Sequence, residues 1–220
     1  VAGTLTVNDG TATVTGAVTG ATTVTGGTLN AQNLGDLTVS GGTVAATGTV
    51  TDLKDVTAGS VTIDGAVTTV TKITAGTVVL KNTVTTVTAI AGGDVTFGGE
   101  VTTLDKVSGT GSMTVNAKVT FKPSSAAVLG AMTINVGTTG ELVLDGTTTT
   151  INIAAATLKG VAGAKITLNN SNTNNVTVGS NQLFQMTTGT AESGALSADK
   201  SYVYATKVGS MASDGFIATT

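Results

Sequence analysis

The chain of 220 residues contains no cysteine, no histidine, no arginine and no tryptophan, and it has a single proline, Pro123. Without cysteine there is neither a disulfide framework nor a thiolate nucleophile. Without histidine and arginine, the usual general base and the usual partners for oxyanions and phosphates are missing. We therefore expect neither an enzyme nor a nucleic-acid-binding protein, and we predict no cofactor.

Charge and long apolar runs are also scarce. Only 10% of the residues are charged, the formal net charge is -3, and the first 50 residues carry only Asp9 and Asp36. No apolar run approaches the roughly 20 residues of a membrane-spanning helix, so we expect no membrane span. A nearly uncharged terminus of Val-Thr strands is unusual for a soluble monomer, because exposed sheet edges are normally protected by charge or proline.

The residue types that dominate favour strands and tight turns. The chain is 40% hydrophobic but only 3% aromatic, so its apolar content is mainly Val, Ala, Leu and Ile, and threonine is abundant. Val and Thr are β-branched and favour strands. The 30 glycines are suited to turns.

The strongest feature is a repeat of about 17 residues between Val50 and Lys118. Its four lines read VTDLKDVTAGSVTIDGA, VTTVTKITAGTVVLKNT, VTTVTAIAGGDVTFGGE and VTTLDKVSGTGSMTVNAK. Apolar residues recur in fixed columns; one is Val50, Val67, Val84 and Val101, and another is Val56, Ile73, Ile90 and Val107. A period of this length is typical of a parallel β-solenoid, in which equivalent residues of successive coils stack on one another.

Within each line, a short strand lies between two corners. In Val61-Thr62-Ile63 the outer residues are apolar and the middle one is polar, as expected of a strand with one buried face. Ala58-Gly59 precedes this strand and Asp64-Gly65 follows it, which predicts tight turns where glycine allows a positive φ. A third bend is needed between Val50 and Leu53, since two residues an odd number apart cannot both face inward from a flat strand. We expect two or three short sides in each coil and favour three.

The sequence therefore predicts an all-β protein, a parallel β-solenoid of about ten coils of roughly 17 residues with a C-terminal β segment. Residues 1–183 would form the solenoid, and residues 184–220 a cap or an assembly segment. The coils are counted from these anchors: Val7, Val24, Val39, Val56, Ile73, Ile90, Val107, Val136, Val161 and Val178. We match Val136 to Val107 and assign the surplus residues between them to an excursion around Lys122–Ser125.

The charged residues predict ladder pairs between coils. Asp55 and Lys72 share one column, and Asp64 and Lys81 share another, so each pair is expected on adjacent coils. Such pairs would help to fix the register, because a slip would separate them.

Two functional alternatives stay open. A polysaccharide-active enzyme would need two converging carboxylates, but Asp52 and Asp105 are expected three coils apart, about 14 Å by strand spacing. An adhesin or ice-binding module would use flat Thr-x-Thr rows such as 69–71 and 86–88, although outward threonines are ordinary on β surfaces. The asparagine-rich run 169–175 is interpreted as a corner loop, with glycosylation at Asn169 or Asn175 as the alternative.

The Val-Thr-Gly-rich lines Val67–Thr83 and Val84–Glu100 carry a resemblance to a known class of proteins. The chain resembles the β-helical passenger (autotransporter-passenger-like) and haemagglutinin-type regions of secreted bacterial surface proteins, and the subunits of surface layers (S-layers) and fibres. The resemblance covers residues 1–183, rests on composition and architecture, and carries over no functional residue. It implies an extracellular or cell-surface setting and a structural or adhesive use.

On these grounds we expect a structural protein that assembles head to tail into an extracellular fibre or surface layer. Its partners would be copies of itself, with cell-surface polysaccharide as a further candidate. The uncharged N-terminal coil would stack on, or accept a strand from, the C-terminal segment of the next molecule. The residues expected at this interface are Leu5, Val7, Tyr202, Val203, Tyr204 and Phe216.

Overall fold

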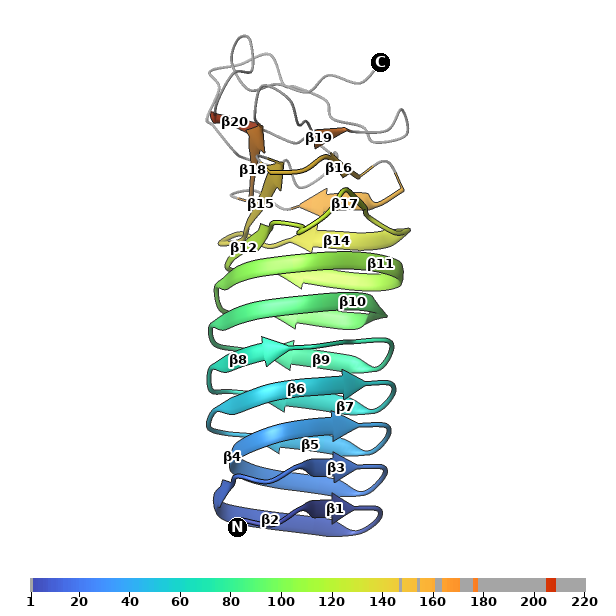
Figure 1. Cartoon of the computed structure of the whole chain (residues 1–220), viewed down its shortest axis with the longest axis vertical. Coiled ribbons are helices and arrows are strands. Elements are labelled where there is room, and N and C mark those ends of the chain that lie inside the picture. The colour runs from blue at the N-terminus through green and yellow to red at the C-terminus, as the bar shows by residue number, and fades with distance from the viewer. Residues whose placement is uncertain are drawn as a thin grey trace.

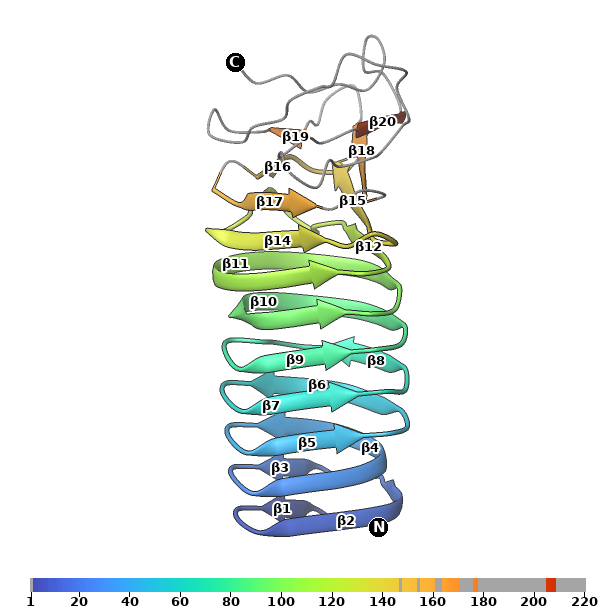
Figure 2. The same cartoon turned by 180° about the vertical axis from the view of Figure 1, so that it is seen from behind.

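The computed structural model describes residues 2–146, 148–153, 155–160, 164–170, 176–177 and 205–208. Within these ranges every regular element is a β-strand, and the strands wind into a solenoid (Figures 1 and 2). All pairings between these strands are parallel, as the examples β1 with β3 and β10 with β11 illustrate. The predicted fold class, a parallel β-solenoid, is confirmed.

Eleven strands build the regular part of the solenoid. They are β1 (Leu5–Val7), β2 (Thr11–Val18), β3 (Thr22–Val24), β4 (Thr28–Val39), β5 (Thr43–Ala46), β6 (Val50–Val56), β7 (Ser60–Ile63), β8 (Val67–Val70), β9 (Thr77–Leu80), β10 (Val84–Phe97) and β11 (Val101–Val115). Figures 1 and 2 show two walls on opposite sides of the rod. We call the wall that contains β5, β7 and β9 the straight wall, and the wall that contains β6 and β8 the bent wall.

The two walls differ in how their residues alternate. In β7 every second residue is buried, at Val61 and Ile63, as in a regular strand. In β6 every third residue is buried, at Val50, Leu53 and Val56. Since residues three apart point to opposite faces of a flat strand, the chain bends between them, as predicted.

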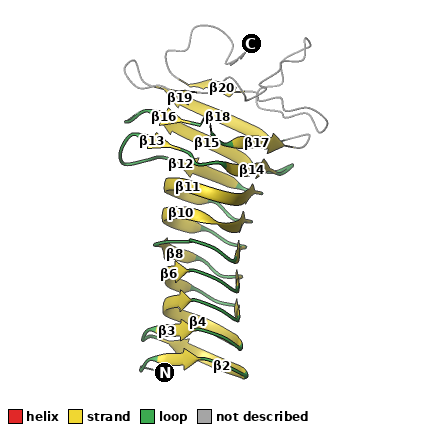
Figure 3. Cartoon of the chain, turned by 90° about the vertical axis from the view of Figure 1, so that its right-hand side faces the viewer, coloured by secondary structure: helices red, strands yellow, loops and turns green. Residues whose placement is uncertain are grey.

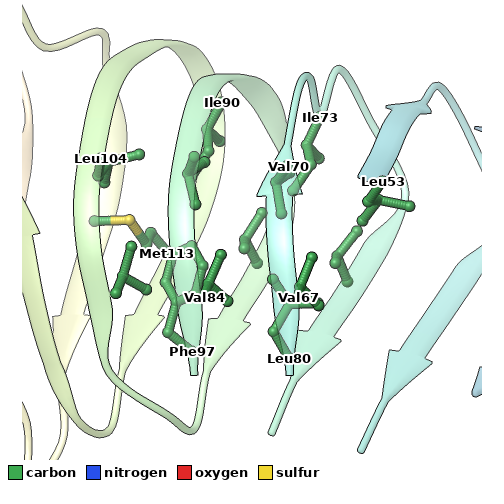
Figure 4. Close-up of a cluster of buried hydrophobic side chains, with 14 of the residues drawn as sticks. Leu53, Val67, Val70, Ile73, Leu80, Val84, Ile90, Phe97, Leu104 and Met113 are labelled. Atoms are coloured by element: carbon green, nitrogen blue, oxygen red, sulfur yellow. The ribbon is translucent and has the colours of Figure 1, made fainter. Parts of the chain in front are cut away.

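Equivalent residues of successive coils stack as the repeat predicts. The register joins Val50 to Val67, Val84 and Val101 in turn, and Val56 to Ile73, Ile90 and Val107. The first anchors stack in the same way, Val7 on Val24 and then Val39 and Val56. The side chains of both walls meet in one continuous apolar core, shown in Figure 4. Leu53, Ile73 and Phe97 have no exposed area there, and burial of such a side chain contributes roughly 1.5–3 kcal/mol.

A column of glycines turns the chain before each strand of the straight wall. Gly42, Gly59, Gly76 and Gly93 have φ values of 74°, 85°, 87° and 83°. The carbonyl of Gly59 accepts a hydrogen bond from the Thr77 N–H of the next coil at 2.9 Å. The positive φ expected at these corners is therefore present, and it aligns the ladder between coils.

The last coils are wider because each gains a third strand. Their strands are β12 (Lys118–Phe121), β13 (Ala127–Val128), β14 (Met132–Val136), β15 (Glu141–Gly146), β16 (Ile151–Asn152), β17 (Thr157–Gly160), β18 (Lys165–Asn170) and β19 (Val176–Thr177). β13, β16 and β19 pair in a separate sheet, which stands as its own stack in Figure 3. A third strand in a coil occurs only here among the described coils.

The extra strand changes the coil count. Along one ladder of register partners, from Val18 to Ile166, the spacings are 16, 16, 17, 17, 17, 18, 23 and 24 residues. These spacings make about eight turns rather than ten, because coils of 23 and 24 residues use up the chain faster. The anchors Val161 and Val178 lie outside the described residues.

The predicted match of Val136 to Val107 is wrong. Val136 pairs with Val115, and Met113 pairs with Ile134. The surplus residues do not form a single excursion around Lys122–Ser125; they enlarge successive coils and build the third strand.

The C-terminal segment is described only in part. β20 (Ala205–Val208) pairs in parallel with β18, with Ala205 opposite Ile166. It lies within the C-terminal β segment predicted for residues 184–220. The other residues of the predicted segment 184–220 lie outside the described ranges.

Candidate assembly site at the N-terminal coil

Among the described strands, β1 and β2 of the first coil each have one edge without a partner, which we call the open end (Figure 1). Among the described strands, β1 pairs with β3 and β2 with β4, in both cases toward the body of the rod. The Leu5 N–H donates to the Ala21 carbonyl and the Val7 carbonyl accepts from the Thr25 N–H, both at 2.9 Å. Because backbone groups of successive strand residues point to opposite sides, those of Thr6 point away from the rod.

The rim of this open end is apolar. Leu5, Ala12 and Val14 are only partly buried, although they pack against the core. In the interior coils, the corresponding core positions are fully buried; Phe97, in the column that begins at Val14, is an example. No described residue covers these side chains on their outer side.

Of the predicted interface residues, only Leu5 and Val7 are described by the structure, and they lie in different surroundings. Leu5 lies on the rim, whereas Val7 is 4% exposed and belongs to the core beneath Val24. Tyr202, Val203, Tyr204 and Phe216 lie outside the described residues. Sequence reasoning missed Thr6, Ala12 and Val14, which the alternation of β1 and β2 could have placed on the free edge.

Charge does little to protect this edge. Asp9 lies at the corner between β1 and β2, where its carboxylate accepts the N–H of Gly10 at 2.7 Å. The next charged residue, Asp36, is on the third coil. An edge with only one flanking charge and no proline favours pairing with another strand.

The main charge cluster lies on the bent wall, away from the open end. Lys54 Nζ lies 2.8 Å from Asp52 Oδ2 and 3.6 Å from Asp36 Oδ2 on the preceding coil. The hydrogen bond to Asp52, followed by the charges of Asp52 and Asp36, raises the pKa of Lys54 above its ordinary value of 10.5. The columns of the repeat did not predict this cluster, because the coil between Asp36 and Asp52 is one residue shorter than the repeat.

One of the two predicted ladder pairs is present. Lys81 Nζ lies 2.8 Å from Asp64 Oδ1, as predicted. The predicted pair of Asp55 with Lys72 is wrong. The Asp55 Oδ1 atom is buried without a hydrogen-bond partner among the described residues. The columns themselves hold, since Val56 and Ile73, which follow Asp55 and Lys72 in the chain, stack on each other, but the two side chains do not form an ion pair.

No pair of carboxylates forms a catalytic arrangement at the positions considered. Asp52 and Thr103 are separated by three steps of the ladder, and Asp105 lies two residues beyond Thr103. Asp52 is engaged by Lys54, and Asp105 accepts the N–H of Ser124. Among the described residues, no group of three or more acidic side chains is placed to hold a metal ion.

The two Thr-x-Thr rows considered for ice binding do stack on each other, but they lie on the bent wall, which is not flat. Thr69 and Thr86 are register partners. They lie on the bent wall, where the chain turns around each buried residue. The flat, regularly alternating surface is the straight wall, and its outward residues are mostly threonine and serine. Period-two alternation in residues 43–46, 60–63 and 77–80 was the available signal.

A shallow hollow interrupts the surface of the first coils. It has a volume of about 200 Å³ and is lined by Thr13, Val14, Thr15, Asn30, Ala31, Gln32, Ala45 and Thr47. Its floor is apolar because Ala31 occupies the core column that carries Leu80 and Phe97 farther along the rod.

Comparison with protein-family models, curated proteins and solved structures found no match. In the part of the chain that the structure describes, no helix is long and apolar enough to cross a membrane. Function must therefore be argued from the solenoid and its surfaces.

Proposed function

We propose that this chain is a structural protein whose molecules join end to end into an extracellular fibre or surface layer. The observation that carries the proposal is the open end: edges of β1 and β2 without a partner among the described strands, an apolar rim, and little charge nearby. A partner that pairs with these edges would satisfy their backbone groups and cover Leu5, Ala12 and Val14. The extracellular setting and a polysaccharide partner rest on the resemblance of the sequence and are parts of the proposal.

The difference between the first coil and the last described coils favours strand addition over direct stacking of coils. The N-terminal coil contributes strands to two walls, whereas the last coils also carry the sheet of β13, β16 and β19. If a wide coil stacked on a narrow one, its third strand would find no partner. A single strand donated by the next molecule could follow the edge of β1 or β2 without this mismatch.

Thr6 offers a direct test. A Thr6→Pro variant removes an outward N–H from the free edge and leaves the pairings of Leu5 and Val7 with β3 intact. We expect wild-type protein to form filaments in negative-stain micrographs and the Thr6→Pro variant to remain as discrete rods. Thr6→Val, which keeps the N–H and the β-branched shape, is the matched control and should form filaments.

Far-UV circular dichroism of each variant would show that the solenoid is intact. Discrete rods from wild-type protein at every concentration tested would reject the proposal. Filaments from the Thr6→Pro variant would show that the contact between molecules does not use the edge of β1.

A further inference from the structure

The first five strands of the straight wall present an outward face without charge. Its ten residues form two columns: Thr11, Thr28, Thr43, Ser60 and Thr77 in one, and Thr13, Asn30, Ala45, Thr62 and Val79 in the other. We call this surface the hydroxyl face, since seven of the ten carry a hydroxyl. None of these side chains makes a hydrogen bond to another described residue, so their polar groups are available to a partner.

Charge is placed around this face and not on it. Asp94 begins the next strand of the straight wall and marks the limit of the face. Asp52, Lys54 and Lys72 lie on the bent wall, and Asp64 and Lys81 at a corner. A solvent-exposed sheet surface ordinarily carries charged side chains. Their exclusion over five successive strands favours a neutral partner that approaches closely.

We propose that the hydroxyl face is a lateral contact between two copies of this chain, packed face to face with their rods antiparallel. The inference rests on the proposed function, because this face alone is small. Five strands at about 4.8 Å spacing and four residues at about 3.3 Å each cover on the order of 300 Å². A stable interface buries about 800 Å² per partner. Repetition along two fibres would supply the missing area by multivalency.

The two-fold axis of this pair lies in the contact plane, parallel to the strand of Thr43 and Ala45, and it makes the face complementary to itself. Each column then faces the same column of the partner in reverse order. Ala45 faces its own copy and allows close approach, and Thr62 faces the amide of Asn30. Val79, the largest aliphatic side chain on the face, comes opposite Thr13.

The hollow supplies the second observation for this arrangement. It lies beside Thr13, and its floor contains Val14 and Ala31. In the antiparallel pair, Val79, Thr62 and Ala45 of each copy therefore face Thr13, Asn30 and Ala45 on the rim of the other copy's hollow and would cover it. In a parallel pair, Val79 would face the column of Thr77, and the Asp94 carboxylates of both copies would lie on the same level of the interface. Their mutual repulsion disfavours that alternative.

Because the chain has no cysteine, engineered thiols give a clear readout. We would prepare the single variants Thr13→Cys and Val79→Cys and oxidise them separately and mixed. Within one chain the two positions are four strands apart, about 19 Å, too far for a disulfide. We expect a disulfide-linked dimer from the mixture and only background dimer from either variant alone. Adding Thr62→Lys to both chains should remove the dimer, because it would place two charges in the contact.

A disulfide-linked dimer from a mixture of Val79→Cys and Thr77→Cys would indicate parallel rods and overturn the proposal. So would the absence of any cross-link in assembled protein, or inhibition of ice recrystallisation by uncross-linked protein, which would assign the face to ice. Filaments that form without the cross-link reject this inference and leave the end-to-end proposal standing. If wild-type protein forms no filaments, cross-linking at high protein concentration still tests the face by itself.

Discussion

Gly59 stands directly on Gly42: a Cβ added to Gly59 would lie 2.5 Å from the Gly42 carbonyl oxygen. The φ of Gly59 is 85°, a conformation that side chains with a Cβ adopt only at a penalty. We therefore predict that Gly59→Ala lowers the free energy of unfolding by at least about 2 kcal/mol. Urea unfolding followed by far-UV circular dichroism measures the change.

Gly16→Ala is the matched control for this prediction. A Cβ at Gly16 has no heavy atom within 4 Å, and its φ is not positive. We expect its stability to stay within about 0.5 kcal/mol of wild type. Equal losses in the two variants would show that the corner column does not require glycine.

Lys54 is predicted to stabilise the junction between two coils through Asp36 and Asp52. Since the folded state raises the pKa of Lys54, its contribution is fully present below the ordinary value of 10.5 and is lost as the pH rises through the raised folded-state pKa. Lys54→Met should therefore lower stability at neutral pH, because it leaves two stacked carboxylates facing each other. The loss should shrink in high salt, since the side chains are exposed.

Lys81→Met provides the comparison for Lys54. Lys81 is paired with the single carboxylate Asp64, so its removal leaves no stacked pair of like charges. We expect a smaller loss of stability, measured by urea unfolding at neutral pH and low salt. A loss as large as that of Lys54→Met would argue against repulsion between Asp36 and Asp52 as the cause.

The sequence predicted the fold because like residues stack on like residues. Residues one repeat apart in the sequence are neighbours in the ladder, so the repeat itself predicts the contacts. The column of Val50, Val67, Val84 and Val101 is an example. The corner glycines could be predicted for the same reason, since their backbone conformation is repeated in every coil.

The departures from prediction occur where the repeat changes length. Val136 was matched to Val107 by similar flanking residues, but the third strand of the wide coils shifts the register to Val115. A two-residue strand such as β13 has too few residues to show a period. The open end was anticipated from the scarcity of charge near the N-terminus. The hydroxyl face was not predicted, because finding it requires knowing which strands form the straight wall.

At the start of the wide coils, Asp105 contacts Ser124. The Asp105 carboxylate accepts the backbone N–H of Ser124 and ties the segment after β12 to the coil beneath. We predict that Asp105→Ala accelerates hydrogen exchange of the Ser124 amide, measured by NMR, and changes global stability by no more than about 1 kcal/mol. Asp105→Asn keeps an acceptor oxygen without the charge and should retain most of the protection. If Ser124 exchanged equally fast in wild type and Asp105→Ala, this bond would not be what holds the segment, and the widening of the coil would depend on the pairing of β13 with β16.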